Sequence, residues 1–304
     1  MSNSIILTKN ICKTYKNAKA LNDFSISIEK GDIYGLIGPN GAGKSTFIKI
    51  VTGLTLPTSG EIELFGSHDF SSARKKIGSI IETPSFFKNL TAYENLIYYC
   101  KQFGCQEDIV DECLKKVKLF NVKNSKKFRE YSLGMKQRLG IALALMNDPQ
   151  LVILDEPTNG LDPVGISELR DIIRELNANG VTFIICSHIL SELSQIATKF
   201  GIINEGKFIK EFTRAELFEM TSDRIIISTA NIDKLKEHLH KRNFAFIDIE
   251  ENTLEVDTKG LTVDDVAKEM INNKITISAI YNKKLSLEDI FFNILSGNGG
   301  TRND

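Results

Sequence analysis

The chain has 304 residues and a formal net charge of −1, so it lacks the basic excess of a typical nucleic-acid-binding surface. Its 42% apolar content is ordinary for a globular protein, and no apolar run reaches the about 20 residues that a bilayer-spanning helix needs. The N-terminal residues lack the basic start and apolar core of a signal peptide. The five cysteines include no Cys-x-x-Cys pair, which favours buried, reduced thiols of a cytosolic protein over a disulfide framework or a zinc site.

Short strands joined by turns are predicted over 4–65, interrupted by a glycine-rich loop and a helix at 44–52. Three helices follow, at 90–103, 107–119 and 132–146. Thr91 and Glu94 form a capping-box pattern that sets the start of the first of these helices. The third is nearly all apolar beyond its first turn.

Two continuous apolar runs, 151–156 and 181–188, are typical of strands buried on both faces of a parallel sheet. A helix is predicted between them at 164–178. Strands that alternate with helices predict an α/β core.

The pattern changes near 210–222, beyond which the predicted order is strand, helix, strand, strand, helix, strand, as in a ferredoxin-like α+β domain. These elements are predicted at 224–229, 231–240, 244–250, 253–257, 262–273 and 275–281. A last helix is expected at 286–295. The expected domains are 1–220 and 221–296, followed by a flexible tail at 297–304.

The segment at 38–45 matches the phosphate-binding pattern G-x-x-x-x-G-K-[ST] and lies between a predicted strand and a predicted helix. Gly41 and Gly43 can adopt backbone angles that aim N–H groups at an anion, and the helix N-terminus adds positive potential. Lys44 is expected to contact the β- and γ-phosphates of a nucleoside triphosphate, and Ser45 to give its hydroxyl to Mg²⁺. The predicted nucleotide-binding residues of this loop are Gly38, Pro39, Asn40, Gly41, Ala42, Gly43, Lys44, Ser45 and Thr46.

Two acids end the apolar run at 151–156. Asp155 is the predicted acid that holds Mg²⁺, together with Ser45, because a phosphate-binding loop needs a carboxylate near its metal. Glu156 beside it is the predicted general base for a hydrolytic water.

With these motifs, the chain resembles the nucleotide-binding subunit of an ATP-binding cassette (ABC) transporter over about 4–212. The segment at 131–145 resembles the family signature, which in the family touches the γ-phosphate held by the other subunit. The signature residues are Ser132, Leu133, Gly134, Met135 and Lys136, with Leu133 where glycine is usual. The resemblance implies ATP and Mg²⁺ as cofactors. It also implies an α/β P-loop NTPase fold, namely an ABC cassette whose RecA-like core carries antiparallel β and helical subdomains, here followed by the ferredoxin-like domain.

The resemblance implies roles for three more residues. Asp162 resembles the D-loop acid that crosses the dimer seam, and His188 resembles the switch histidine that contacts the γ-phosphate. Tyr15 resembles the aromatic residue that stacks on adenine. The alternatives are a structural histidine and a surface tyrosine.

Glu82 directly follows the segment 76–81. At the position of Glu82, most relatives have a glutamine that senses Mg²⁺ and the attacking water. A carboxylate can accept a hydrogen bond from that water or reach the metal, so Glu82 is both a catalytic and a metal-binding candidate. This glutamate resembles the branch of the family that exports lantibiotics and bacitracin-like peptides for self-protection. The alternative is neutral drift within the wider drug-export group.

The hypothesis is therefore the ATPase subunit of an ABC exporter, held at the cytoplasmic face of the cell membrane by a separate membrane permease. It is expected to pair as a homodimer or with another cassette subunit, and to bind no nucleic acid. Permease docking is expected near Glu82, Phe86 and Phe87. The alternatives are an importer, a non-hydrolysing binding module, or an ABC ATPase acting on ribosomes or DNA. The 86 residues from Ser45 to Tyr131 leave no room for the long coiled coil of DNA-repair members.

Overall fold

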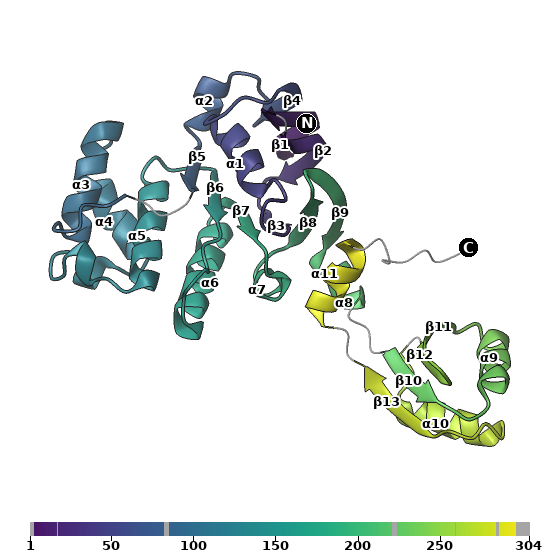
Figure 1. The fold of residues 1–304 in the computed structure, drawn as a ribbon. Coiled ribbons are helices and arrows are strands. Elements are labelled where there is room, and N and C mark those ends of the chain that lie inside the picture. Colours follow the sequence, from purple (N-terminus) through teal and green to yellow (C-terminus); the bar gives the residue numbers. More distant parts are fainter. Residues whose placement is uncertain are drawn as a thin grey trace. The chain divides into compact units, whose positions relative to one another are not determined.

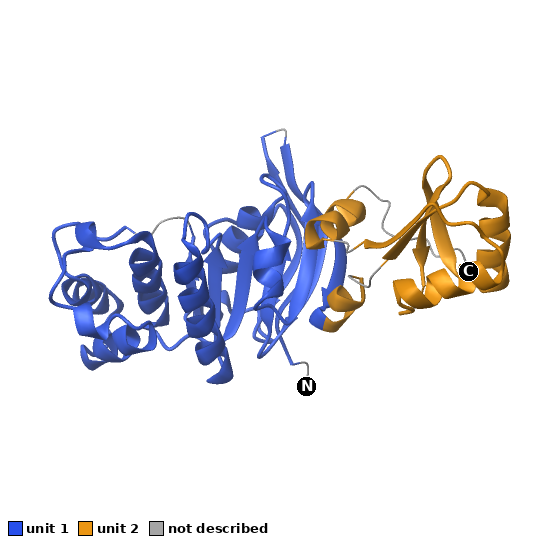
Figure 2. Ribbon diagram, turned by 90° about the horizontal axis from the view of Figure 1, so that it is seen from below, with its two compact units in different colours: residues 1–214 blue, residues 215–304 orange. Residues whose placement is uncertain are grey.

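The computed structural model describes residues 3–16, 18–81, 85–220, 224–258, 260–283 and 286–295. The chain divides into two compact units, residues 1–214 and 215–304 (Figure 2). No helix in the described part of the chain is long and apolar enough to cross a membrane.

A six-stranded sheet forms the centre of the first unit, with strand order β5-β6-β7-β3-β8-β9. All neighbouring pairs are parallel except β8 and β9. The strands are β3 (Ile33–Ile37), β5 (Ile77–Ile80), β6 (Leu151–Asp155), β7 (Thr182–Ser187), β8 (Lys199–Asn204) and β9 (Lys207–Thr213). Because β3, β6 and β7 are parallel neighbours, the loops after them meet at one edge of the sheet. That edge carries the predicted site.

An antiparallel sheet of order β2-β1-β4 packs over one face of this sheet. Its strands are β1 (Ser4–Tyr15), β2 (Ala18–Glu29) and β4 (Ser59–Leu64), so the strands predicted here as short include two of 12 residues. Helix α1 (Lys44–Thr52) contributes Phe47, Ile48 and Val51 to the core shared by the two sheets. The short helix α2 (Phe70–Arg74) follows β4. The core therefore fixes α1, and with it the glycine-rich loop, against both sheets.

Helices cover the other face of the six-stranded sheet. The helices α6 (Pro163–Ala178) and α7 (Leu190–Ser194) contact β7, and α5 (Leu133–Leu145) contacts β5. The approach of α5 is so close that a Cβ added at Gly78 would lie 2.1 Å from the Ala144 carbonyl oxygen. A glycine is therefore required at that crossing.

Three helices form a group beside the β5 edge (Figure 1). They are α3 (Ala92–Phe103), α4 (Asp108–Lys116) and α5, with 3₁₀ turns at Phe120–Val122 and Phe128–Glu130. The predicted capping box is confirmed: the Glu94 N–H donates to the Thr91 hydroxyl at 3.2 Å, and the Thr91 N–H donates to the Glu94 carboxylate at 2.8 Å. The sequence therefore fixes the start of α3 locally.

The second unit contains an antiparallel sheet of order β11-β12-β10-β13. Along the chain its elements are β10 (Arg224–Ser228), α9 (Ile232–Lys241), β11 (Ala245–Glu250), β12 (Thr253–Asp257), α10 (Val263–Asn272) and β13 (Ala279–Lys283). Helix α8 (Arg214–Met220) precedes them and α11 (Leu287–Leu295) follows. Ile225, Leu239, Val256 and Met270 belong to a core confined to this unit.

One predicted strand is displaced. The sequence predicted a strand at 275–281, whereas β13 runs Ala279–Lys283. The partner strand β10 ends at Ser228, which pairs with Ala279, so residues before Ala279 have no ladder position to occupy. Ile275 and Ile277 instead pack into the core of the unit, which explains their strand-like apolar spacing.

Candidate nucleotide-binding site

The glycine-rich loop follows β3 and has left-handed backbone angles at Gly41 (φ 82°) and Gly43 (φ 113°). At Gly43 an added Cβ would lie 2.6 Å from the Ala20 carbonyl oxygen and 2.9 Å from Leu21 Cδ2. At Gly38 it would lie 2.3 Å from the Ile203 carbonyl oxygen. Backbone angle and packing both require glycine at Gly43, because any side chain would displace the loop from β2.

A pocket of about 200 Å³ lies beside this loop. Its lining residues are Ala20, Asn40, Gly41, Ala42, Gly43, Lys44, Ser45, Thr46, Asp155 and Glu156. The lining thus combines backbone N–H groups at the start of α1, one ammonium group and two carboxylates. A phosphate chain fits the first two features and a divalent cation fits the carboxylates.

Lys44 is almost fully buried, with 6% of its side chain exposed. Its Nζ donates to the carbonyl oxygens of Gly38 at 2.6 Å and Pro39 at 3.3 Å, and lies 3.4 Å from Glu156 Oε1. The loop that carries Lys44 therefore also holds its ammonium group at the pocket. A buried ammonium with so little solvent is a strong ligand for an anion.

Ser45 and Asp155 form the part of the site that fits a metal ion. The Ser45 hydroxyl donates to Asp155 Oδ2 at 2.9 Å, while Asp155 Oδ1 is buried without a hydrogen-bond partner. Burial raises the pKa of the Asp155 carboxyl, the hydrogen bond from Ser45 opposes that rise, and Glu156 adds to it. A buried carboxylate with an unused oxygen beside a hydroxyl is suited to Mg²⁺, which this pair would hold through direct or water-mediated contacts.

Glu156 lies between Lys44 and His188. The His188 Nδ1 atom is 2.9 Å from Glu156 Oε2, and the Glu156 N–H donates to the Cys186 carbonyl oxygen at 2.9 Å. The backbone of Glu156 is left-handed, with φ 48°, which is uncommon for a non-glycine residue. Such a conformation persists only where the surroundings impose it. The Glu156 carboxylate lines the pocket.

The predicted signature lies elsewhere in the chain. Ser132 caps α5 by accepting from the Met135 N–H at 3.2 Å, and Leu133 is 41% exposed. The Lys136 ammonium lies 5.6 Å from the centroid of the Phe128 ring. Among the described residues, the lining of the phosphate-loop pocket includes none of Ser132, Leu133, Gly134, Met135 and Lys136.

Asp162 caps α6, where its carboxylate accepts from the Gly165 N–H at 2.8 Å. It is exposed and next to the signature: a Cβ added at Gly160 would lie 3.0 Å from Leu133 Cδ2. The starts of α5 and α6 therefore adjoin and share an exposed surface. The pocket lining does not include Asp162 either.

Tyr15 is a predicted site residue that does not line this pocket. Tyr15, at the end of β1, is 43% exposed, and the Lys13 ammonium lies 4.9 Å from its ring centroid. Glu82 lies outside the described residues.

Sequence reasoning missed Asn95. This side chain is fully buried on α3; its Oδ1 accepts from the Phe87 N–H at 2.8 Å, and its amide donates to the carbonyls of Phe87, Leu90 and Thr91. Asn95 thus holds the segment before α3. The available signal was a polar residue between Ala92 and Leu96 on the buried stripe of the helix.

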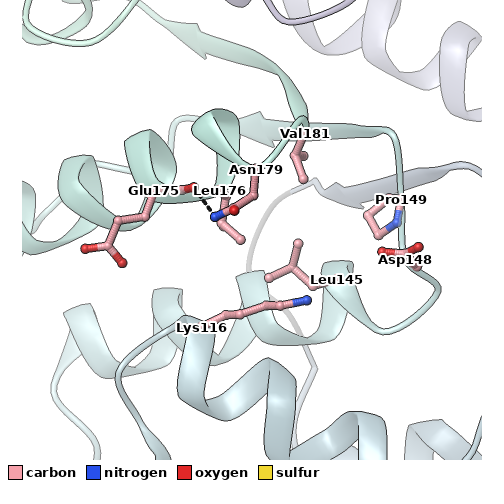
Figure 3. A pocket seen from close by; sticks show the side chains of 8 residues that line it. All are labelled: Lys116, Leu145, Asp148, Pro149, Glu175, Leu176, Asn179 and Val181. Carbon is pink, nitrogen blue, oxygen red and sulfur yellow. Dashed lines mark hydrogen bonds between the residues drawn. The ribbon is translucent and has the colours of Figure 1, made fainter.

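A second pocket, of about 150 Å³, lies between the ends of α4, α5 and α6 (Figure 3). Its lining is Lys116, Leu145, Asp148, Pro149, Glu175, Leu176, Asn179 and Val181. The Asn179 amide donates to the Glu175 carbonyl oxygen at 2.7 Å, so this polar group is already satisfied. Among the described residues, no predicted site residue lines this second pocket.

Known proteins match this chain over nearly its whole length. A family model described as ABC transporter matches residues 21–159. The bacitracin transport ATP-binding protein BcrA of Enterococcus faecalis is 39% identical, over 97% of this chain and 97% of its own. The protein of the same name from Bacillus licheniformis is 39% identical over 97% and 98%. The lantibiotic transport ATP-binding protein SrtF of Streptococcus pyogenes is 48% identical over 72% of this chain and 96% of its own.

Solved structures of ABC proteins also match this chain. A structure of cbiO1 from Clostridium perfringens, described as part of an ABC transporter complex, is 28% identical with a TM-score of 0.65 over 72% of this chain and 92% of that one. A dimeric ATP-binding cassette in a post-hydrolysis state, bound to ADP and Pi, is 28% identical with a TM-score of 0.60 over 69% and 98%. The chain belongs to the ATP-binding proteins of ABC transporters, and its first unit has the mixed α/β cassette fold.

Proposed function

We propose that this chain hydrolyses ATP in the phosphate-loop pocket and thereby powers the export of a peptide antibiotic through a separate permease. The observation that carries the catalytic part is the placement of Glu156 between Lys44 and His188, beside the Ser45–Asp155 pair. A cation, a candidate base and a metal-binding pair thus lie at one edge of one sheet.

The proposed roles follow from these contacts. The N–H groups of 40–46 and the Lys44 ammonium bind the phosphates, while Ser45 and Asp155 hold Mg²⁺, which would neutralise phosphate charge. Glu156 accepts a proton from the attacking water, and His188 orients Glu156 and contacts the γ-phosphate. Tyr15 is proposed to stack on adenine, and Glu82 to act at the metal and the water.

A dimer is part of the proposal because the signature and Asp162 do not line the pocket of their own chain. Two chains arranged head to tail would bring Ser132 and the start of α5 of one chain to the pocket of the other, where a helix N-terminus faces an anion favourably. The dimeric cassette bound to ADP and Pi supports a dimer by likeness. A homodimer or a pair with a related subunit would satisfy it equally.

Permease docking is proposed at the segment before α3, which would place the chain at the cytoplasmic face of the membrane. The structure corrects one expected contact: Phe86 is only 8% exposed, because it packs against Phe128 at 5.1 Å between ring centroids. Phe87 is 45% exposed and stacks edge-on against Tyr98 at 4.8 Å. Phe87 and Tyr98 are therefore exposed aromatic side chains that a partner could contact near this segment.

The proposed substrate class is the bacitracin-like or lantibiotic peptides. Its support is the names of the relatives, of which the two bacitracin proteins match nearly the whole chain and the lantibiotic protein matches 72% of it. We propose a ferredoxin-like fold for the second unit, supported by its β-α-β-β-α-β order and by the sheet order β11-β12-β10-β13.

The substitution Glu156→Gln tests the catalytic proposal. It keeps the size of the side chain and removes the base, so ATP binding should persist while turnover falls by at least about 100-fold. Bound ATP should then hold a dimer that gel filtration detects. Glu175→Gln, on the exposed surface of α6, is the matched control and should hydrolyse ATP like the wild type. Wild-type turnover by Glu156→Gln in the presence of the permease would contradict the proposal.

Growth of a deletion strain in the presence of bacitracin and lantibiotics tests the substrate class. Loss of the gene should sensitise the strain to at least one such peptide. Complementation with Glu82→Gln should restore much of the resistance, and with Glu82→Ala little. Unchanged susceptibility to every peptide would contradict the substrate class and leave the ATPase proposal standing.

A further inference from the structure

Two of the five cysteines lie together at the C-terminal end of α3. Gly104, with φ 70°, ends this helix, and the N–H groups of Gly104 and Cys105 both donate to the Cys100 carbonyl oxygen. This is the hydrogen-bond pattern of a glycine-capped helix end, in which the residue four positions before the glycine and the residue directly after it commonly contact each other. Here both positions are cysteines, so the backbone itself brings the two side chains together.

The two sulfur atoms are 2.8 Å apart. A disulfide has an S–S length of about 2.05 Å, so they need to approach by less than about 1 Å. Cys100 Sγ lies 3.0 Å from the Cys105 carbonyl oxygen and 3.3 Å from that of Gln106. The two sulfur atoms are therefore adjacent in a turn that backbone hydrogen bonds already hold.

Burial distinguishes the two thiols. Cys100 is fully buried, whereas Cys105 is half-buried and its neighbours Gly104 and Gln106 are exposed. Burial raises the pKa of the Cys100 thiol to about 12, and Cys105, Glu107 and Asp108 add to the rise. Cys105 is therefore the thiol that a reagent from solution reaches first, and Cys100 is the thiol held behind it.

The other three cysteines lack such a partner within the described residues. Cys113 and Cys186 are fully buried and burial raises the pKa of each, to about 12 for Cys113. The Cys12 thiol donates to Asp23 Oδ1 at 3.3 Å. All five thiols are free, as the cysteine spacing predicts, but within the described residues Cys100 and Cys105 also lie together.

We propose that Cys100 and Cys105 form a thiol–disulfide modification site that a low-molecular-weight disulfide such as glutathione disulfide oxidises. The Cys105 thiolate attacks one sulfur of the reagent, whose S–S bond breaks and releases one thiolate. The Cys100 thiolate then attacks the Cys105 sulfur of this mixed disulfide and releases the second reagent thiolate. The protein loses two thiol protons, which the two released thiolates take up; the protein is oxidised and the reagent disulfide is reduced to two thiols.

The cross-link would fasten the end of α3 covalently. This helix carries the exposed rings of Tyr98 and Phe103, so the modification affects an aromatic surface of the first unit. Amide hydrogen exchange of 103–106 should slow in the oxidised chain, because the capped turn can no longer open freely.

The test treats the reduced, full-length protein with glutathione disulfide at pH 8, alkylates the remaining thiols in denaturant, and maps the peptides by mass spectrometry. The expected product is a Cys100–Cys105 peptide that lacks two hydrogen atoms and resists alkylation. Its two thiols should disappear at least about ten-fold faster than those of Cys12, Cys113 and Cys186. A glutathione adduct that persists on Cys105, or five thiols lost at similar rates, would overturn the proposal.

Two variants separate the attack of Cys105 on glutathione disulfide from the attack of Cys100 on the mixed disulfide. Cys100→Ser should stop at the glutathione adduct of Cys105, and Cys105→Ser should leave Cys100 reduced. Cys113→Ser is the matched control and should cross-link as the wild type does. Cys105 is half-buried, so Cys105→Ser is expected to fold even if Cys100→Ser does not. Rapid oxidation of Cys100 in Cys105→Ser would show that the two thiols do not act together.

Discussion

Gly41 and Gly43 both have left-handed backbone angles, but only Gly43 also lacks space for a side chain. Gly43→Ala should therefore weaken ATP binding by more than about ten-fold and cost about 1–3 kcal/mol of stability, because the new Cβ meets the Ala20 carbonyl. Gly41→Ala, where nothing lies within 4 Å of the added Cβ, should keep binding and lose about 1 kcal/mol. Titration with a fluorescent nucleotide and urea unfolding measure both effects. Equal losses in the two variants would contradict the packing argument.

Asp155 should destabilise the protein in the absence of nucleotide, because burial raises the pKa of its carboxyl above the ordinary 3.8. Between 3.8 and the raised pKa, the folded chain binds more protons than the unfolded chain, so the free energy of unfolding falls as pH rises. Asp155→Asn should therefore raise the melting temperature at pH 7 by a few degrees, while abolishing hydrolysis. The gain should shrink as the pH falls toward 3.8.

Differential scanning calorimetry at several pH values measures this effect, with Asp171→Asn as a control on an exposed ion pair of α6. An exposed pair contributes little, so the control should leave the melting temperature nearly unchanged. A lower melting temperature for Asp155→Asn at pH 7 would contradict the argument.

For single residues of the site, the sequence predicts which side chains lie close together but not how they contact one another. Lys44, Asp155 and His188 each lie at or beyond the carboxyl end of a strand of a predicted parallel sheet, and such ends meet at one edge. The left-handed backbone of Glu156 and its contacts with Lys44 and His188 have no local signal. They arise only when three strands far apart in the sequence become neighbours.

Helix α3 carries the buried side chain of Asn95, which binds the backbone of the segment before the helix. Asn95→Leu keeps the approximate volume but leaves the Phe87 N–H without its acceptor, which should cost about 2–4 kcal/mol. Gln102→Leu, on the exposed face of the same helix, should cost less than about 0.5 kcal/mol. Urea unfolding measures both. If Asn95→Leu is as stable as the wild type, Asn95 does not hold this segment.

Whole elements were predicted best where a local signal sets an end. The capping box of Thr91 and Glu94 gives the start of α3. The five-residue helices α2 and α7 were not predicted, because so short a run contains little periodicity. The start of β13 was also missed, since it depends on where its partner strand β10 ends. Lengths set by tertiary pairing are not encoded in a strand's own residues.

At the scale of the whole molecule, each unit has a hydrophobic core of its own, represented by Phe47 in the first and Leu239 in the second. Calorimetry should therefore resolve two unfolding transitions. ATP with Mg²⁺ should raise the melting temperature of the first unit only, because a ligand stabilises the unit that binds it. At an ATP concentration of 100 times its Kd, this stabilisation is about 2.7 kcal/mol.

Two variants assign these transitions. Lys44→Ala should abolish the shift by ATP, since it removes the buried ammonium group from the pocket. Leu239→Ala should lower only the second transition, by about 2–5 kcal/mol, because it leaves a cavity in the core between α9 and the antiparallel sheet. The ATP-induced shift of the first transition should remain in Leu239→Ala. The contrary result is a single unfolding transition whose melting temperature rises with ATP and falls in Leu239→Ala. It would show that the two cores unfold together.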